Sequence, residues 1–322
     1  MQRTFLIDTD TASDDAVALI MALRSPDIKV AAITTVAGNV PVWQGTRNAL
    51  YVAELCGSKV PVFAGAEKPL WREYLDASWF HGQDGLGDHG YAAPARAAEP
   101  AHAVDAIVEC VHRHPGITFI TLGPLTNIAL ALAKDPGIAA KVGRCVVMGG
   151  NPCSEGNVTP AAEYNIWVDP EAARMVLRAG MPTELVGWHL CRGEAALSAW
   201  DIERVRGFGS RVGRFAIESN STAQEAYRIQ TGEVGISLPD PVAMAIALDP
   251  SVCTSASEHL VDVEVAGELT RGATVVDRLG VGGDGRNRDV WKAARPVRIC
   301  WTIDTARWKE TLYRALRDEA TS

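Results

Sequence analysis

Short apolar, β-branched runs alternate with longer stretches of helical periodicity along most of the chain. The apolar runs predict strands at 4–8, 29–36, 60–63, 117–122, 145–148 and 183–186. The helical stretches lie at 14–24, 41–56, 101–114, 125–134 and 170–179. This alternation predicts an α/β fold with a mostly parallel, Rossmann-like central sheet and helices on both of its faces.

The pattern changes in the last third of the chain. It is mainly helical from about 198 to 248, and strand signals return at 260–265, 274–276 and 297–300 before a closing helix. We therefore expect a helical insertion and a few antiparallel edge strands. Because no internal repeat or low-complexity linker interrupts the pattern, we expect residues 1–322 to form a single domain.

Composition narrows the class of protein. The 322 residues are 47% hydrophobic and carry a net charge of −8, which argues against a nucleic-acid or anionic-membrane surface. No apolar run approaches the roughly 20 residues of a membrane span, and the first residues lack a signal-peptide layout. The seven cysteines are scattered without CxxC spacing, which favours reduced thiols in a cytoplasmic protein.

Four aspartates follow the first predicted strand within eight residues: Asp8, Asp10, Asp14 and Asp15. Carboxylates this close repel one another unless a cation lies among them. Asp14 and Asp15 alone could simply favour the positive end of the helix that begins there. That interpretation leaves Asp8 and Asp10 unexplained, so the cluster predicts a hard divalent metal at the mouth of the sheet.

Further polar residues follow other strands at the same edge of the predicted sheet. They are Asn39 after the second strand, the segment 122–127 after the fourth, and Met148-Gly-Gly150 and the loop with Asn157, Glu163 and Asn165 after the fifth. Ligands of open α/β sheets bind beyond the carboxyl ends of the strands. Asn39 could be an ordinary turn residue, and Asp240 before Pro241 could be a helix N-cap. The convergence of so many polar groups nevertheless predicts a ligand site. The long segments 67–100 and 149–169 support it, because long loops in compact domains are usually functional.

The motifs, taken in order, resemble the calcium-dependent nucleoside hydrolases of the inosine–uridine-preferring family. The matching segments are Asp8-Thr-Asp10, Asp14-Asp15, Ala37-Gly-Asn39, His81-Gly-Gln-Asp-Gly-Leu-Gly87, Leu122-Gly-Pro-Leu-Thr-Asn127, Met148-Gly-Gly150, 156–166, Asp169-Pro170 and Asp240-Pro241. Any one of these is weak evidence, but the ordered set spans nearly the whole chain.

The resemblance implies a Ca²⁺ ion and specific roles for the matching residues. The implied metal ligands are Asp10, Asp15, the backbone carbonyl of Leu122 and Asp240. The implied ribose pocket comprises Asp14, Asn39, Asn157, Glu163, Asn165 and the backbone at Met148. The implied reaction is hydrolysis of the N-glycosidic bond of a ribonucleoside. A Ca²⁺-held water loses its proton to Asp10 and attacks C1′ through an oxocarbenium-like transition state. The family also implies a homodimer or homotetramer.

One departure concerns protonation of the leaving base. Many family members carry a histidine where this chain has Pro239. His81 is the first candidate to replace it, followed by His189 and the segment Tyr227-Arg228-Ile-Gln230. Alternatively, the substrate needs no acid because its base leaves already activated, as in a cationic nucleoside such as nicotinamide riboside. Contacts with the base are expected from the loops 71–87 and 223–236.

Two other functions compete with this interpretation. A haloacid-dehalogenase-type phosphatase would use Asp8 as nucleophile and Asp10 as acid, with Asp284 and Asp289 as a late metal motif. That function leaves Asp14, Asp15 and the 156–166 motif without a role. The second alternative is a nucleoside-binding protein with little turnover, which the proline at position 239 favours.

Overall fold

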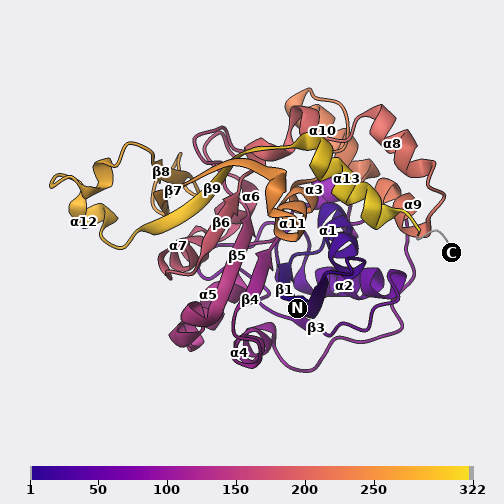
Figure 1. Ribbon diagram of the computed structural model, residues 1–322, viewed down its shortest axis with the longest axis horizontal. Helices are drawn as coiled ribbons and strands as arrows, with labels where there is room; N and C mark the ends of the chain where they lie inside the picture. The colour runs from indigo at the N-terminus through magenta and orange to yellow at the C-terminus, as the bar shows by residue number, and fades with distance from the viewer. Residues whose placement is uncertain (1, 319–322) are drawn as a thin grey trace.

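The computed structural model describes residues 2–318, whose nine strands form one sheet. The strands are β1 (Arg3–Thr9), β2 (Ile28–Thr35), β3 (Val62–Ala64), β4 (Ile117–Thr121), β5 (Val142–Met148), β6 (Thr183–Val186), β7 (Cys253–Val263), β8 (Thr274–Asp277) and β9 (Arg295–Ile303). Their order across the sheet is β3-β2-β1-β4-β5-β6-β9-β7-β8 (Figure 1). The pairs from β3 to β9 are parallel, whereas β7 pairs antiparallel with β9 and β8. The predicted fold class is confirmed.

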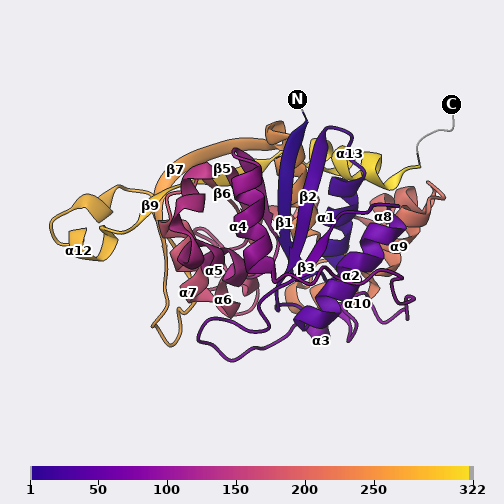
Figure 2. The same cartoon turned by 90° about the horizontal axis from the view of Figure 1, so that it is seen from below.

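Helices cover both faces of the sheet. The helices are α1 (Ser13–Leu23), α2 (Val42–Leu55), α3 (Ser78–His81), α4 (Ala103–Arg113), α5 (Thr126–Lys134), α6 (Tyr164–Val168), α7 (Pro170–Arg178), α8 (Ala199–Arg206), α9 (Arg211–Glu218), α10 (Ser221–Thr231), α11 (Pro239–Leu248), α12 (Arg288–Trp291) and α13 (Thr305–Leu316). Figure 2 shows α4 and α1 on opposite sides of β1.

Alternate side chains of β1 explain the two layers. Phe5 and Ile7 pack into a core with residues of α1, α2, α11 and α13, whereas Leu6 packs into a second core with residues of α4, α5 and α7. Successive side chains of a strand point to opposite faces of the sheet, so a central strand buried on both faces is apolar throughout. The β1 sequence Phe-Leu-Ile meets that requirement.

The main difference from the predicted elements lies in β7. This strand begins at Cys253, seven residues before the predicted start, and pairs with β9 from Cys253 opposite Ile303 onward. The residues that follow Cys253, Thr-Ser-Ala-Ser-Glu-His, have no clear apolar alternation because much of this stretch is exposed. Their strand conformation comes from pairing with β9, which local pattern does not reveal.

Short helices occupy both long segments that were expected to be functional. The helix α3 lies in the first segment and contacts α10 of the helical insertion, and α6 lies in the second. Neither was predicted, because a helix of four or five residues leaves almost no periodic signal. Within residues 2–318, no helix combines the length and apolarity that crossing a bilayer requires. The single-domain organisation of residues 1–322 stays a prediction, and residues 1 and 319–322 lie outside the described residues.

A buried amide ties together the strand ends that carry the polar residues. Asn127 donates through Nδ2 to Asp8 Oδ1 (2.8 Å) and to the Thr35 carbonyl (2.9 Å), and its Oδ1 accepts from the Ala66 backbone N–H (2.9 Å). The side chain is fully buried. It therefore joins the ends of β1 and β2 to the segment that follows β3.

Replacing Asn127 with alanine should lower the free energy of unfolding by about 2–4 kcal/mol, because buried groups lose their partners. Urea denaturation followed by circular dichroism measures this change. Asn287→Ala is the control, since Asn287 makes one surface hydrogen bond to the Val281 carbonyl. It should cost less than about 1 kcal/mol. Equal effects of the two variants would contradict the assigned role of Asn127.

Candidate active site

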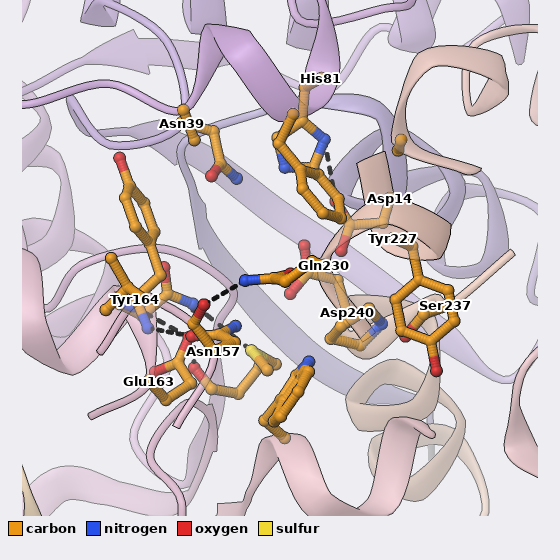
Figure 3. Close-up of a pocket in the computed structure, with 18 of the residues that line it drawn as sticks. Asp14, Asn39, His81, Asn157, Glu163, Tyr164, Tyr227, Gln230, Ser237 and Asp240 are labelled. Carbon is orange, nitrogen blue, oxygen red and sulfur yellow. Dashed lines mark hydrogen bonds and ion pairs between the residues drawn. The ribbon is translucent and has the colours of Figure 1, made fainter. Parts of the chain in front are cut away.

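A cavity of about 280 Å³ opens at the carboxyl ends of the strands. Nine of the eleven predicted site residues line it: Asp14, Asn39, His81, Leu122, Met148, Asn157, Glu163, Asn165 and Asp240. Figure 3 shows several of them pointing toward one shared space. Asp10 and Asp15 do not line it and are fully buried.

Asp10 lies at the end of β1, enclosed by two loops. Its Oδ2 accepts a hydrogen bond from the Asn39 backbone N–H (2.6 Å), whereas its buried Oδ1 has no hydrogen-bond partner within the described part of the chain. A Cβ at Gly38 would lie 2.1 Å from Asp10 Oδ2, and one at Gly123 would lie 2.7 Å from Oδ1. Both loops therefore need glycine in order to approach this carboxylate.

Asp15 is oriented by hydrogen bonds at both of its oxygens. Thr9 Oγ1 donates to Oδ1 (2.5 Å), and the Ala12 backbone N–H donates to Oδ2 (2.9 Å). The hydrogen bond from Ala12 satisfies one of the free N–H groups at the start of α1, so Asp15 does interact with the helix terminus. It does not account for the other carboxylates beside Asp15.

Carboxylate oxygens of Asp14, Asp15 and Asp240 all lie within 4.8 Å of one another. Burial raises the pKa of Asp14 to about 6, and burial together with the charge of Asp15 raises the pKa of Asp240. Burial raises the pKa of Asp10 as well, and the charge of Asp15 adds to the effect. Four buried acids this close are unfavourable without a compensating positive charge.

The donor set fits a hard divalent cation. Asp10 Oδ1 and Asp14 Oδ1 are both buried and lack partners among residues 2–318. Carboxylate and carbonyl oxygens are the ligands that Ca²⁺ and Mg²⁺ prefer. The three carboxylates that lie within 4.8 Å of one another include Asp14, whereas the metal ligands implied by the sequence include Asp10 instead. The charges of Asp10 and Asp15 nevertheless both raise the pKa of Asp240. Asp10 therefore belongs to the same cluster.

The Leu122 carbonyl also faces this region and retains one free lone pair. It accepts from Asn165 Nδ2 (2.8 Å), which also lies 3.3 Å from the Met148 carbonyl oxygen. A carbonyl oxygen has two lone pairs, so one remains for an ion. Asp240 is in the first turn of α11, whose N-cap is Leu238, so the N-cap interpretation of Asp240 was wrong.

The segment from Asn157 to Asn165 is held in place by its own side chains. Glu163 is the N-cap of α6 and accepts from the backbone N–H of Asn165 (2.9 Å) and of Gly150 (2.8 Å). Asn157 Oδ1 accepts from the Tyr164 N–H (2.9 Å). Glu163 thus has a structural role that the sequence analysis missed, in addition to facing the cavity.

His81, at the end of α3, has its ring in the cavity wall. Its Nδ1 lies 2.8 Å from Ser13 Oγ and 3.9 Å from Asp14 Oδ1. Burial lowers the pKa of His81 to about 4, and the negative charge of Asp15 opposes that shift. The imidazole is therefore neutral at pH 7, and it can give a hydrogen bond but holds no extra proton.

The other candidates for the leaving-group acid fit less well. His189 does not line the cavity, and Arg228 pairs with Glu225 at the surface. Tyr227 and Gln230 do line it, but the Tyr227 hydroxyl donates to Glu233 and Gln230 Nε2 donates to the Asn157 carbonyl. Figure 3 shows Gln230 reaching toward Asn157.

The geometry does not support the phosphatase alternative. Asp8 does not line the cavity, and its Oδ1 accepts from Thr34 Oγ1 (2.5 Å) and Asn127 Nδ2 (2.8 Å). A phosphatase of that type would also leave Asp14 and Glu163, which line the cavity, without a role. Asp284 lies next to α12, which carries Asp289, in the projection at the far edge of the sheet (Figure 1).

Both loops expected to contact the base reach the cavity. The first contributes Leu75, Asp76, Ala77, Trp79, Phe80 and His81, and the second contributes Ala223, Tyr227 and Gln230. Trp71 does not line it. The sequence analysis missed Trp188, Asn220 and Ser237, for which no motif gave a signal, and Tyr164, whose position between Glu163 and Asn165 could have revealed it.

Comparison with known proteins gives matches along most of the chain. The family model for inosine-uridine preferring nucleoside hydrolases matches residues 5–310. The pyrimidine-specific ribonucleoside hydrolase RihA of Salmonella paratyphi A is 38% identical over 293 residues, which cover 90% of this chain and 93% of that protein.

Solved structures agree with this match. A plant nucleoside hydrolase, the PpNRh1 enzyme, superposes with a TM-score of 0.93 at 33% identity, covering 99% of this chain and 100% of that one. A purine-preferring ribonucleoside hydrolase from Gardnerella vaginalis has a TM-score of 0.87 at 30% identity, covering 98% of both chains.

Replacing Asp240 with asparagine should raise the melting temperature measured in EGTA, because it removes one charge from the buried cluster. If the cluster binds Ca²⁺, the ion should stabilise the wild type by about 2.7 kcal/mol at a hundredfold excess over Kd, and the variant should lose most of that stabilisation. Differential scanning fluorimetry with and without Ca²⁺ tests both effects. Asp105→Asn, at an exposed site, is the control and should change neither value. A destabilised variant with an unchanged Ca²⁺ response would refute the cluster as a cation site.

Proposed function

Because the chain belongs to the inosine-uridine preferring nucleoside hydrolase family and is an N-ribosyl hydrolase of ribonucleosides, we propose that it works with a Ca²⁺ ion. The observation that carries this proposal is the buried group of carboxylates with partnerless oxygens beneath a polar cavity. Asp10, Asp15, Asp240 and the Leu122 carbonyl would hold the ion. When bound, it would supply positive charge that acidifies water and orients two vicinal ribose hydroxyls.

Asp10 is the proposed general base. Its Oδ1 has no hydrogen-bond partner among residues 2–318, while the Asn39 N–H donates to Oδ2 and so fixes the direction of the carboxylate. A positioned base of this kind takes the proton from the attacking water as the bond to C1′ forms. Burial raises the pKa of Asp10, which strengthens it as a base, and a nearby cation keeps it ionised at neutral pH.

The remaining polar groups are proposed to bind the ribose. Asp14, Asn39, Asn157, Glu163, Asn165 and the backbone at Met148 line the cavity and offer acceptors and donors to the sugar hydroxyls. The transition state of glycoside hydrolysis carries positive charge on the ring, and the carboxylates around it stabilise that charge.

His81 is the proposed partner of the leaving base. As a neutral imidazole, it would donate one hydrogen bond to the base as the C1′–N bond breaks, and its ring is placed by Ser13 Oγ. The compared relatives are named pyrimidine-specific in one case and purine-preferring in another, so we propose that ribose is the shared recognition element. A cytoplasmic location is also part of the proposal and is supported by the free cysteines. A homodimer or homotetramer is proposed from the resemblance to the family.

Asp10→Ala should lower kcat by about 10²–10⁴-fold, because a positioned base contributes that much. The fold should persist, so the circular dichroism spectrum should match that of the wild type. Release of reducing sugar from uridine and inosine with saturating Ca²⁺ measures the effect, with Asp105→Ala as the surface control. Wild-type activity in the Asp10 variant would show that the base has been wrongly assigned.

His81→Ala should lower kcat by about 10²-fold for neutral nucleosides, with a larger loss for poorer leaving groups. A series of uridines with electron-withdrawing substituents at C5 would show this as a steeper dependence of log kcat on the pKa of the base. An equal loss for every member of the series would indicate that His81 only supports the cavity wall.

A further inference from the structure

The hydroxyl groups that line the cavity already donate their protons within the protein. Tyr227 donates to Glu233, and Ser237 Oγ donates to the Cys191 carbonyl (2.9 Å). The Tyr164 hydroxyl lies 2.8 Å from the Gly38 carbonyl oxygen and 2.9 Å from that of Leu75. A hydroxyl has a single proton to donate. None of these three groups has one left for a departing base.

The amides nearby are committed in part, because an amide NH2 group has two protons to donate and Gln230 uses one of them. Asn220 Nδ2 donates to the carbonyls of Ser13 (3.1 Å) and Ala216 (2.9 Å), and Gln230 donates to Asn157. Pro239, which also lines the cavity, carries no donor. Among residues 2–318, His81 is the one histidine that lines the cavity. One hydrogen bond from it would stabilise a departing anion less than full protonation would.

The charge of the cavity wall is one-sided. Asp14, Asp76, Glu163 and Asp240 line it, whereas no lysine or arginine among residues 2–318 does so. Arg192, which does not line the cavity, pairs with Glu233, and its guanidinium lies over the ring of the lining residue Trp188 (4.8 Å). A dication would offset two of these charges, so the wall would remain negative.

Two features of the rim suit a positive base. Asp76 lines the cavity and is exposed, and its Oδ1 accepts hydrogen bonds from Ser78 N (3.0 Å) and Oγ (2.6 Å). Trp79 is also at the rim, with 61% of its surface exposed. An aromatic face and a carboxylate both attract a cationic ring.

We propose that this site acts most efficiently on ribonucleosides whose base is positively charged, such as an N-ribosyl pyridinium or an N7-alkylated purine. The proposal rests on the proposed function above. When the C1′–N bond breaks, its electron pair returns to the ring nitrogen and cancels the positive charge, so the base leaves neutral without a proton. Water adds to C1′ and gives its proton to Asp10. A neutral nucleoside would instead release an anion, which this wall has no full acid to protonate.

Steady-state kinetics on the full chain with Ca²⁺ test the proposal. Nicotinamide riboside is the pyridinium probe, and uridine and inosine are the neutral ones. Guanosine and 7-methylguanosine form a matched pair that differs by one methyl group and its charge. We expect kcat/KM to be about 10²-fold or more higher for the cationic member of each comparison. Equal or faster turnover of the neutral nucleosides would overturn this inference and leave the proposed function intact. Absence of turnover with every probe would overturn the proposed function itself.

Asp76→Asn separates attraction of the cation from proton donation. We expect the ratio of kcat/KM for nicotinamide riboside to that for uridine to fall about 5-fold, mainly through a higher KM for the cation. Glu73→Gln, an exposed carboxylate of the same loop that does not line the cavity, is the matched control and should leave the ratio unchanged. A fall in kcat for uridine with no change for the cation would identify Asp76 as an acid and refute the proposal.

Discussion

The burial of several carboxylates at one point is the constraint on which this site depends. Asp10, Asp15 and Asp240 are almost wholly removed from solvent, and their mutual repulsion raises the free energy of the folded chain unless a cation offsets it. The surrounding structure accommodates that burial. Gly38 and Gly123 allow the loops to close over Asp10, and backbone N–H groups orient the carboxylates.

The cavity joins two parts of the chain with different functions. Its floor comes from the carboxyl ends of parallel strands, where Asn127 ties β1 and β2 together and backbone hydrogen bonds fix Glu163. Its upper wall comes from α3 and α10, which contact each other although they are far apart in sequence. In the proposed function the floor binds the ion and the ribose, and ribose is common to every ribonucleoside. In the same proposal the upper wall meets the base, and we infer from its hydrogen-bonded hydroxyl and its carboxylate that it favours a base that leaves without a proton.

Much of the fold follows from local pattern because apolar period and length distinguish buried strands from helices. The boundaries of β1, β2, β4 and β6 differ from the prediction by one residue or less at each end. The start of β7 was missed because its polar residues become a strand only by pairing with β9. The short helices α3 and α6 were missed because they are too short to show a period, yet they carry His81 and Asn165.

The sequence by itself determined the family, the edge of the sheet where the site lies, and the residues that converge there, because strand ends and motif order are local properties. The tertiary structure alone decided how those residues are used. It places Asp10 and Asp15 behind the cavity, brings His81 into the wall and leaves His189 outside it. It also decides which donors are already committed, as in the bond from Gln230 to Asn157. These outcomes depend on hydrogen bonds and packing between distant segments, which no local pattern of residues encodes.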